Sequence, residues 1–196
     1  MAIAHIPVFY RPEMTARSQF FAPGTIKPAA CVDDWLANRL PIEVRDFSPA
    51  TRANLALAHD QDYVDGVLDC RVRNGFGGFQ QDVAASLPFT TGAMMAAAEE
   101  ALLAGGVACA PVSGFHHAHW AESSGFCTFN GLVVTARHLL EVGYARRIGI
   151  LDLDQHWGDG TEAILQRLRI DRVVHDSVGR EPRGPRDAEP FLKGLA

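Results

Sequence analysis

Hydrophobic and polar positions alternate along this chain in segments of helical and strand length, most clearly after residue 48. Helical periodicity, capping residues and terminal glycines predict helices over 49–58, 61–68, 92–103, 131–142 and 161–168. Short apolar runs predict strands over 6–10, 107–112, 148–153 and 172–176. Strand and helix alternate three times in the second half. This order predicts an α/β fold of three layers, α/β/α, around a mostly parallel sheet.

Prolines and glycines mark the parts of the chain that do not follow this pattern. Pro7, Pro12, Pro23 and Pro28 interrupt the first forty residues, where we expect a loop-rich entry after the first short strand. The glycine-rich segment 74–80 follows no strand and opens no helix, so we expect a plain loop. No repeat or linker divides residues 1–196, which we therefore take as a single domain.

Composition narrows the class of protein. With 47% hydrophobic and 21% charged residues, the chain has the balance of a soluble globular domain. A net charge of −5 argues against direct nucleic-acid binding. No apolar run reaches the roughly 20 residues of a membrane span, and nothing at the start looks like an export signal, so we expect a cytoplasmic protein. The four cysteines form no CxxC pair, which predicts neither a zinc knuckle nor a disulfide framework.

The most informative segment begins as a buried strand and reads Asp152-Leu-Asp-Gln-His-Trp-Gly-Asp-Gly-Thr. Because side chains on a strand alternate between faces, Asp152, Asp154 and His156 project to one side if the extended conformation continues. Two buried carboxylates need a cation or strong donors, and carboxylate with imidazole suits zinc or a similar divalent metal. The alternative is an aspartate that caps the next helix beside a solvated histidine.

Two further segments follow the strand predicted over 107–112. Ser113-Gly-Phe-His-His-Ala-His-Trp carries adjacent histidines, His116 and His117, which suit a general base and an electrostatic stabiliser, or else a surface loop. Glu122-Ser-Ser-Gly-Phe-Cys-Thr-Phe-Asn-Gly offers close backbone approach at Gly125 and an aromatic wall at Phe126. We expect Cys127 and Phe129 to pack in the core. The carboxyl ends of parallel strands are where an α/β site assembles, which favours a common site for these segments.

In their order and spacing, the three motifs resemble the histone deacetylase superfamily, including its bacterial members. The resemblance runs from about residue 90 to 178. A less specific element upstream, Ala56-Leu-Ala-His-Asp-Gln-Asp-Tyr-Val, is similar to the family's VHxxxYV element.

The resemblance implies a role for each matched residue. Zinc would be held by Asp154 and His156, His117 would act as general base and acid, and His116 would support the transition state. Carboxylates that orient the pair would be Asp152 toward His116 and Asp159 toward His117. The acyl-lysine channel would be lined by Gly125 and Phe126. A monovalent cation, potassium, would be bound by Asp152, Asp154, His156, Ser177 and Val178.

The implied reaction is hydrolysis of an acyl-lysine or a related acylated amine, such as a polyamine, by metal-activated water. Two family elements are missing, however: the third metal ligand, an aspartate in a GxDxxxxDPLG loop, and a later tyrosine that polarises the carbonyl. We therefore expect the N-terminal part of a deacetylase-like domain, with a sheet incomplete at the C-terminus and a further crossover helix beginning near 189–196.

Three classes of protein can be compared with the motifs in this sequence. The first is a deacylase completed by further sequence, a completing chain or a second copy in a homo-oligomer. The second is a catalytically inactive fragment or pseudoenzyme of the same fold with a binding or assembly role. A ureohydrolase on a similar fold would need DAHxD and SxDxxDP motifs, and neither occurs.

Overall fold

The computed structural model describes residues 5–17 and 23–180. Two pairs of parallel strands and six α-helices make up most of this part. Along the chain the elements are β1 (Ile6–Phe9), short 3-10 turns at Pro12–Met14 and Pro23–Ile26, α1 (Lys27–Ala37), β2 (Ile42–Arg45), α2 (Arg52–Leu55), α3 (Gln61–Leu68), α4 (Gln81–Ala104), α5 (Gly131–Glu141), β3 (Ile148–Asp152), α6 (Asp159–Leu168), β4 (Val173–Ser177) and a last 3-10 turn at Val178–Arg180.

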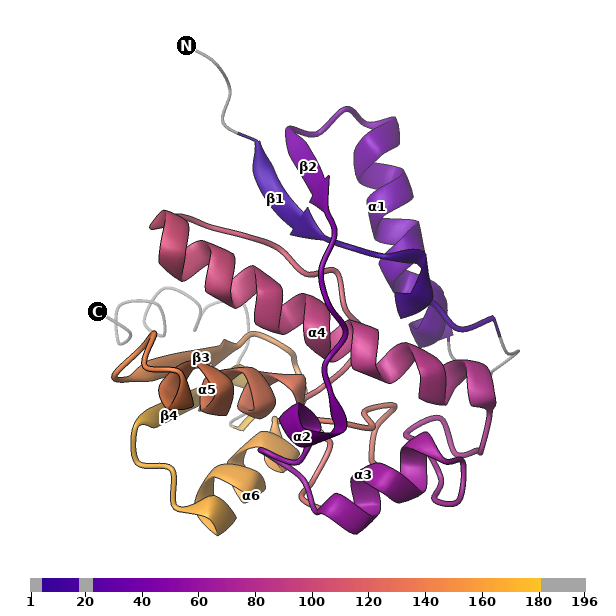
Figure 1. Ribbon diagram of the computed structural model, residues 1–196, viewed down its shortest axis with the longest axis vertical. Helices are drawn as coiled ribbons and strands as arrows, with labels where there is room; N and C mark the ends of the chain where they lie inside the picture. Colours follow the sequence, from indigo (N-terminus) through magenta and orange to yellow (C-terminus); the bar gives the residue numbers. More distant parts are fainter. Residues whose placement is uncertain (1–4, 18–22, 181–196) are drawn as a thin grey trace.

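All strand pairs are parallel, as predicted, and the α/β class is confirmed. β1 pairs with β2, and β3 pairs with β4. The long helix α4 crosses the centre of the molecule and packs on β1 on one side and on α5 on the other (Figure 1). Among the described residues the sheet is thus divided into two separate pairs of strands.

The strand predicted over 107–112 is wrong in extent. It is reduced to a single parallel bridge between Val8 and Cys109. Pro111 has no backbone N–H to give to a ladder, and Val107 has 70% of its surface exposed rather than buried. At this bridge the chain passes β1 on its way from α4 to the loop with the tandem histidines.

The start predicted for the helix over 92–103 is also wrong. Helix α4 starts at Gln81 and continues through Pro88 to Ala104. Both the Ser86 and the Thr90 hydroxyls donate to carbonyls three residues earlier, and the Pro88 carbonyl accepts the N–H of Ala50. Pro88 therefore lies inside a continuous helix, and its carbonyl has a partner outside that helix. The predicted C-terminus is confirmed, since Gly105 adopts φ 64° as a left-handed cap.

A proline near the start of the chain also lies in a helix rather than in the expected loop. Pro28 lies in the first turn of α1, where its missing N–H costs nothing, so it begins a helix rather than breaking one. Neither α1 nor β2 was predicted. Helix α2 is shorter than expected and begins after Thr51, whose hydroxyl accepts the N–H of Asn54. The crossover helix expected near 189–196 lies outside the described residues.

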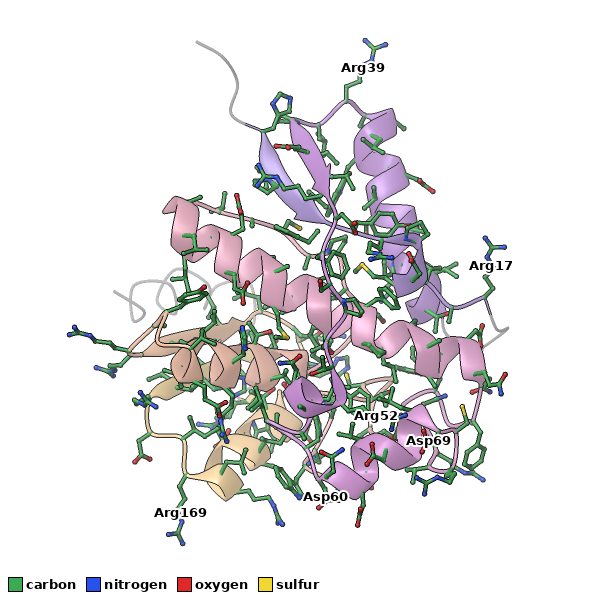
Figure 2. All side chains as sticks on the ribbon, in the orientation of Figure 1. Arg17, Arg39, Arg52, Asp60, Asp69 and Arg169 are labelled. Atoms are coloured by element: carbon green, nitrogen blue, oxygen red, sulfur yellow. The ribbon has the colours of Figure 1, made fainter. Side chains whose placement is uncertain are left out.

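Helix α3 has the predicted bounds. Its N-cap is Asp60, which accepts the N–H groups of Asp62 and Tyr63. Figure 2 shows Arg52 beside Asp69 at the other end of the helix, where the two form an ion pair at 2.6 Å. Within the described residues no helix is long and apolar enough to cross a membrane.

A buried histidine ties α3 to the loops that carry the motifs. His59 is 1% exposed. Its Nε2 accepts the N–H of Asn130, and its Nδ1 lies 3.2 Å from the carbonyl of Trp120. Burial lowers the pKa of His59 from 6.5 to about 4. The imidazole is therefore neutral in the fold at neutral pH.

This neutral histidine predicts a loss of stability in mild acid. Since the folded pKa of His59 is about 4 and the unfolded one 6.5, protons bind the unfolded chain first. The contribution of neutral His59 to the free energy of unfolding is present above pH 6.5 and is lost as the pH falls toward 4. Between pH 7 and pH 5 the loss should be about 2 kcal/mol. Urea unfolding should show a steeper loss of stability between pH 7 and pH 5 in wild type than in His59→Gln, and exposed His5→Gln should behave like wild type. Equal slopes for His59→Gln and wild type would contradict it.

Candidate functional site

The predicted site residues gather where β3 and β4 end. In the parallel register Asp152 lies opposite Ser177, so both carboxyl ends meet at one edge. The loop with the tandem histidines is held there by α6, because the Thr161 N–H donates to the His116 carbonyl at 3.0 Å. A Cβ on Gly160 would lie 2.5 Å from the carbonyl oxygen of Ala118, so only glycine permits this close approach.

The first histidine and its carboxylate form a buried pair. Nδ1 of His116 lies 2.8 Å from Oδ2 of Asp152, and their side chains are 12% and 8% exposed. The same oxygen accepts the Ser177 hydroxyl at 3.3 Å, and Oδ1 accepts the N–H of Asp154 at 3.1 Å. Donors thus fix both oxygens of Asp152, and Asp152 in turn fixes the orientation of His116.

The second histidine has a carboxylate of its own at the start of α6. Nδ1 of His117 lies 2.7 Å from Oδ1 of Asp159, and the N–H of Gly160 donates to that oxygen at 2.9 Å. Partial burial raises the pKa of Asp159, but the hydrogen bonds from His117 and Gly160 outweigh it and leave the pKa below its usual value. Asp159 is therefore charged at neutral pH, which favours the proton of His117 on Nδ1 and leaves Nε2 free.

Asp154 and His156 contact each other at the open side of the site. Nδ1 of His156 lies 2.8 Å from Oδ1 of Asp154, and their side chains are 63% and 49% exposed. The backbone N–H of His156 donates to the same oxygen and lowers the pKa of Asp154. Ring centroids are 4.1 Å apart for His116 and His117, and 6.0 Å apart for His117 and His156. The three imidazoles therefore face one site.

Of the site side chains described above, Asp154 and His156 are the two that lie together as metal donors. Within the described ranges no group of three or more histidine, cysteine or acidic side chains could hold a metal ion. A carboxylate oxygen and an imidazole nitrogen side by side are of the type that zinc prefers. The donors fit zinc in kind but fall short in number.

Gly125 lies directly against His117, and Phe126 follows it in the chain. Gly125 has φ 51°, and a Cβ there would lie 2.4 Å from Cδ2 of His117, so a side chain at 125 would displace the imidazole. Phe126 also has a positive φ, 63°, and is 49% exposed. The glycine-rich loop, expected to be plain, contributes Phe76, whose ring centroid lies 5.8 Å from that of Phe126.

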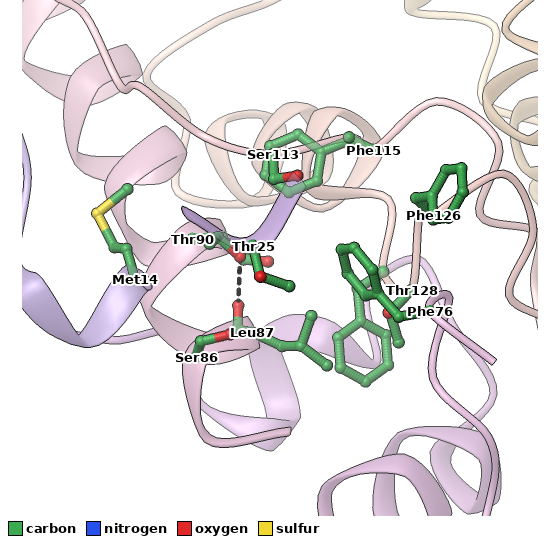
Figure 3. A pocket seen from close by; sticks show the side chains of 13 residues that line it. Met14, Thr25, Phe76, Ser86, Leu87, Thr90, Ser113, Phe115, Phe126 and Thr128 are labelled. Atoms are coloured by element: carbon green, nitrogen blue, oxygen red, sulfur yellow. Dashed lines mark hydrogen bonds between the residues drawn. The ribbon is translucent and has the colours of Figure 1, made fainter. Parts of the chain in front are cut away.

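These two rings border a small cavity of about 20 Å³ (Figure 3). Hydroxyl side chains also line it, among them Ser86, Thr90 and Ser113. A space of this size holds about one water molecule. Phe76 was missed because its loop lies far from the motifs in the sequence, and no local pattern marks its contact with Phe126.

The core placement of Cys127 and Phe129 is confirmed, since they are 1% and 2% exposed. Burial raises the pKa of the Cys127 thiol to about 11, so it is protonated at neutral pH and a poor nucleophile.

Ser177 and Val178 lie on the β4 side of the site. The Ser177 hydroxyl accepts the N–H of Gly158 at 3.0 Å besides donating to Asp152. Val178 opens the last 3-10 turn. Sequence reasoning missed His175, whose side chain is 4% exposed and whose Nε2 lies 3.8 Å from Oδ2 of Asp152. Burial lowers the pKa of His175.

Comparison with protein-family models identifies one family. Residues 27–178 match the family described as "Histone deacetylase domain". An uncharacterised protein of Picosynechococcus sp. is 38% identical over 120 residues, which cover 59% of this chain and 40% of that protein. A probable deacetylase of Methanothermobacter thermautotrophicus is 37% identical over 95 residues, 48% of this chain and 28% of that protein.

Among solved structures, the HDA15 HD domain matches with a TM-score of 0.74 and 18% identity, over 89% of this chain and 54% of that one. At this identity the likeness concerns the fold. The chain spans less than half the length of the two relatives and about half of the solved domain.

Proposed function

The chain belongs to the histone deacetylase domain family, and from this membership we propose that it carries the tandem-histidine part of a zinc-dependent deacylase site. The reaction is hydrolysis of an acylated amine, with acyl-lysine or an acylated polyamine as the substrate class. The observation that carries the proposal is the pair of His–Asp contacts, at 2.8 Å and 2.7 Å, beside Asp154 and His156.

His117 moves the proton in this proposal. With Nδ1 on the charged Asp159, its Nε2 is free to take a proton from the attacking water and to return it to the leaving amine. His116 is held at Nδ1 by the more deeply buried Asp152, and in this role it carries a proton on both ring nitrogens and supports negative charge on the acyl oxygen by donating from Nε2. The different burial of the two carboxylates supports this division of labour.

Asp154 and His156 would hold the zinc, together with a donor from outside the described residues. When bound, zinc polarises the acyl carbonyl and lowers the pKa of water, so the reaction needs no nucleophile from the protein. Potassium beside Asp152 and Ser177 belongs to the same proposal and rests on the adjacency of these two residues in the strand register. Gly125 and Phe126 would border the path of the acylated side chain, with Phe76 opposite Phe126.

A second candidate is a binding or assembly protein that kept the fold without the reaction. The observation in its favour is the donor set of two where catalytic zinc normally has three protein ligands. Intact His–Asp pairs favour the deacylase, since a site without a reaction has no need for two oriented imidazoles.

The test uses protein isolated from its native cells, with any polypeptide that completes it, loaded with zinc and given a fluorogenic acetyl-lysine peptide. We expect hydrolysis by wild type, and loss of both zinc and hydrolysis in Asp154→Asn. Asp171→Asn makes the same chemical change at an exposed residue outside the site and should behave like wild type. Zinc-loaded wild type without hydrolysis of acetyl-lysine or acetylated polyamines would favour the second candidate.

A further inference from the structure

Asp159 faces two imidazoles, one on each carboxylate oxygen. Nδ1 of His117 lies 2.7 Å from Oδ1, and Nε2 of His119 lies 3.5 Å from Oδ2. The N–H of Gly160 also donates to Oδ1. One oxygen is therefore fixed by two donors, while His119 is positioned to hold the other.

The backbone at His119 and at the preceding residue is hydrogen-bonded. Its N–H donates to the Glu122 carbonyl at 2.9 Å, and the two residues form an antiparallel bridge. The preceding residue, Ala118, is fully buried, and its carbonyl accepts the amide of Asn130, which is also fully buried. With 32% of its side chain exposed, His119 is mostly covered and directed at Asp159 rather than at solvent.

We propose that His119 is a positioning residue, which holds Oδ2 of Asp159 and thereby keeps Oδ1 on Nδ1 of His117. A carboxylate held at only one oxygen can rotate about its Cβ–Cγ bond, and Asp159 is 38% exposed. Contact at both oxygens restricts that rotation. The imidazole of His117 then keeps its proton on Nδ1 and its Nε2 free.

The consequence for catalysis rests on the proposed function, since Nε2 of His117 is the proton carrier there. In a completed, active enzyme His119→Phe should lower kcat several-fold and leave KM unchanged, because His119 acts through Asp159 and not on the substrate. The pairing itself needs neither zinc nor substrate and is tested separately.

The experiment is ¹⁵N imidazole NMR on the metal-free 196-residue chain at neutral pH, below the concentration at which light scattering detects self-association, with His117 assigned through a His117→Gln sample. We expect wild type to show the Nδ1–H form of His117 with slow proton exchange. In His119→Phe, exchange of that proton should accelerate about 2- to 5-fold, the effect of one weak contact between partly exposed groups. His119→Gln supplies an amide donor at the same place and should restore slow exchange.

The matched control is His138→Phe, which removes a histidine paired with Glu99 outside the site. It should leave His117 unchanged. Unaltered exchange in His119→Phe would overturn the proposal, as would equal acceleration in His119→Phe and His119→Gln, because that pattern indicates general loosening of the loop. Absence of deacylase activity in the completed protein would overturn the proposed function and leave this result standing.

Discussion

Replacing His117 with alanine in the zinc-loaded, completed protein is expected to abolish most turnover and to leave the zinc in place. The imidazole is bonded to Asp159 through Nδ1, so its assigned task is proton transfer rather than coordination. General acid–base groups typically contribute about 10²–10⁴-fold to the rate. The measurements are kcat on an acetyl-lysine peptide and zinc content by elemental analysis of the same sample.

The control for this variant is His138→Ala, since His138 is also paired with a carboxylate, at 2.6 Å, but lies outside the site. It should retain both zinc and turnover. Unchanged hydrolysis by His117→Ala would refute the role of His117. Loss of zinc together with activity would instead make His117 a ligand.

The residues of the site were predictable because their signals are local. Asp152 and Asp154 follow an apolar strand at alternate positions, and His116 and His117 are adjacent in a second short motif. The first motif lies at the carboxyl end of β3, and the N–H of Thr161 in α6 holds the loop with the second motif beside it. The contribution of His119 had no such signal, because it depends on how α6 presents Asp159.

Three errors in the predicted fold came from prolines, whose effects depend on their position in an element and on tertiary contacts. Pro88 is accommodated inside α4 while its carbonyl accepts the N–H of Ala50, a partner 38 positions earlier in the chain. Pro28 is harmless because it lies in the first turn of a helix. Conversely, the apolar run over 107–112 has the composition of a regular strand, but Pro111 within it has no N–H to give to a strand ladder. Position within an element decides what proline does, and local composition does not reveal that position.

For the 196-residue chain by itself, we expect weak zinc binding and negligible hydrolysis of acyl-lysine. Catalytic zinc normally has three protein ligands and a water, and the described residues bring together two, Asp154 and His156. A missing carboxylate removes both a bond and a negative charge that offsets the cation. The tyrosine expected from the family resemblance is absent as well, and an oxyanion donor of this kind is often worth about 3 kcal/mol.

Exposed apolar side chains add an expectation of self-association. Leu151 and Val174 lie on neighbouring strands, Leu153 follows β3, and they are 47%, 53% and 64% exposed, which favours dimers or poor solubility. Calorimetric zinc titration, a fluorogenic acetyl-lysine assay and light scattering on the purified chain test these points together. Tight one-to-one binding with robust turnover would contradict them.

Asp176 is an unsuitable substitute ligand, because it pairs with Leu151 in the register and so faces away from Asp152 and Ser177. The replacement would then have to come from residues 181–196 or from a second copy, and only the second source makes activity rise more steeply than protein concentration.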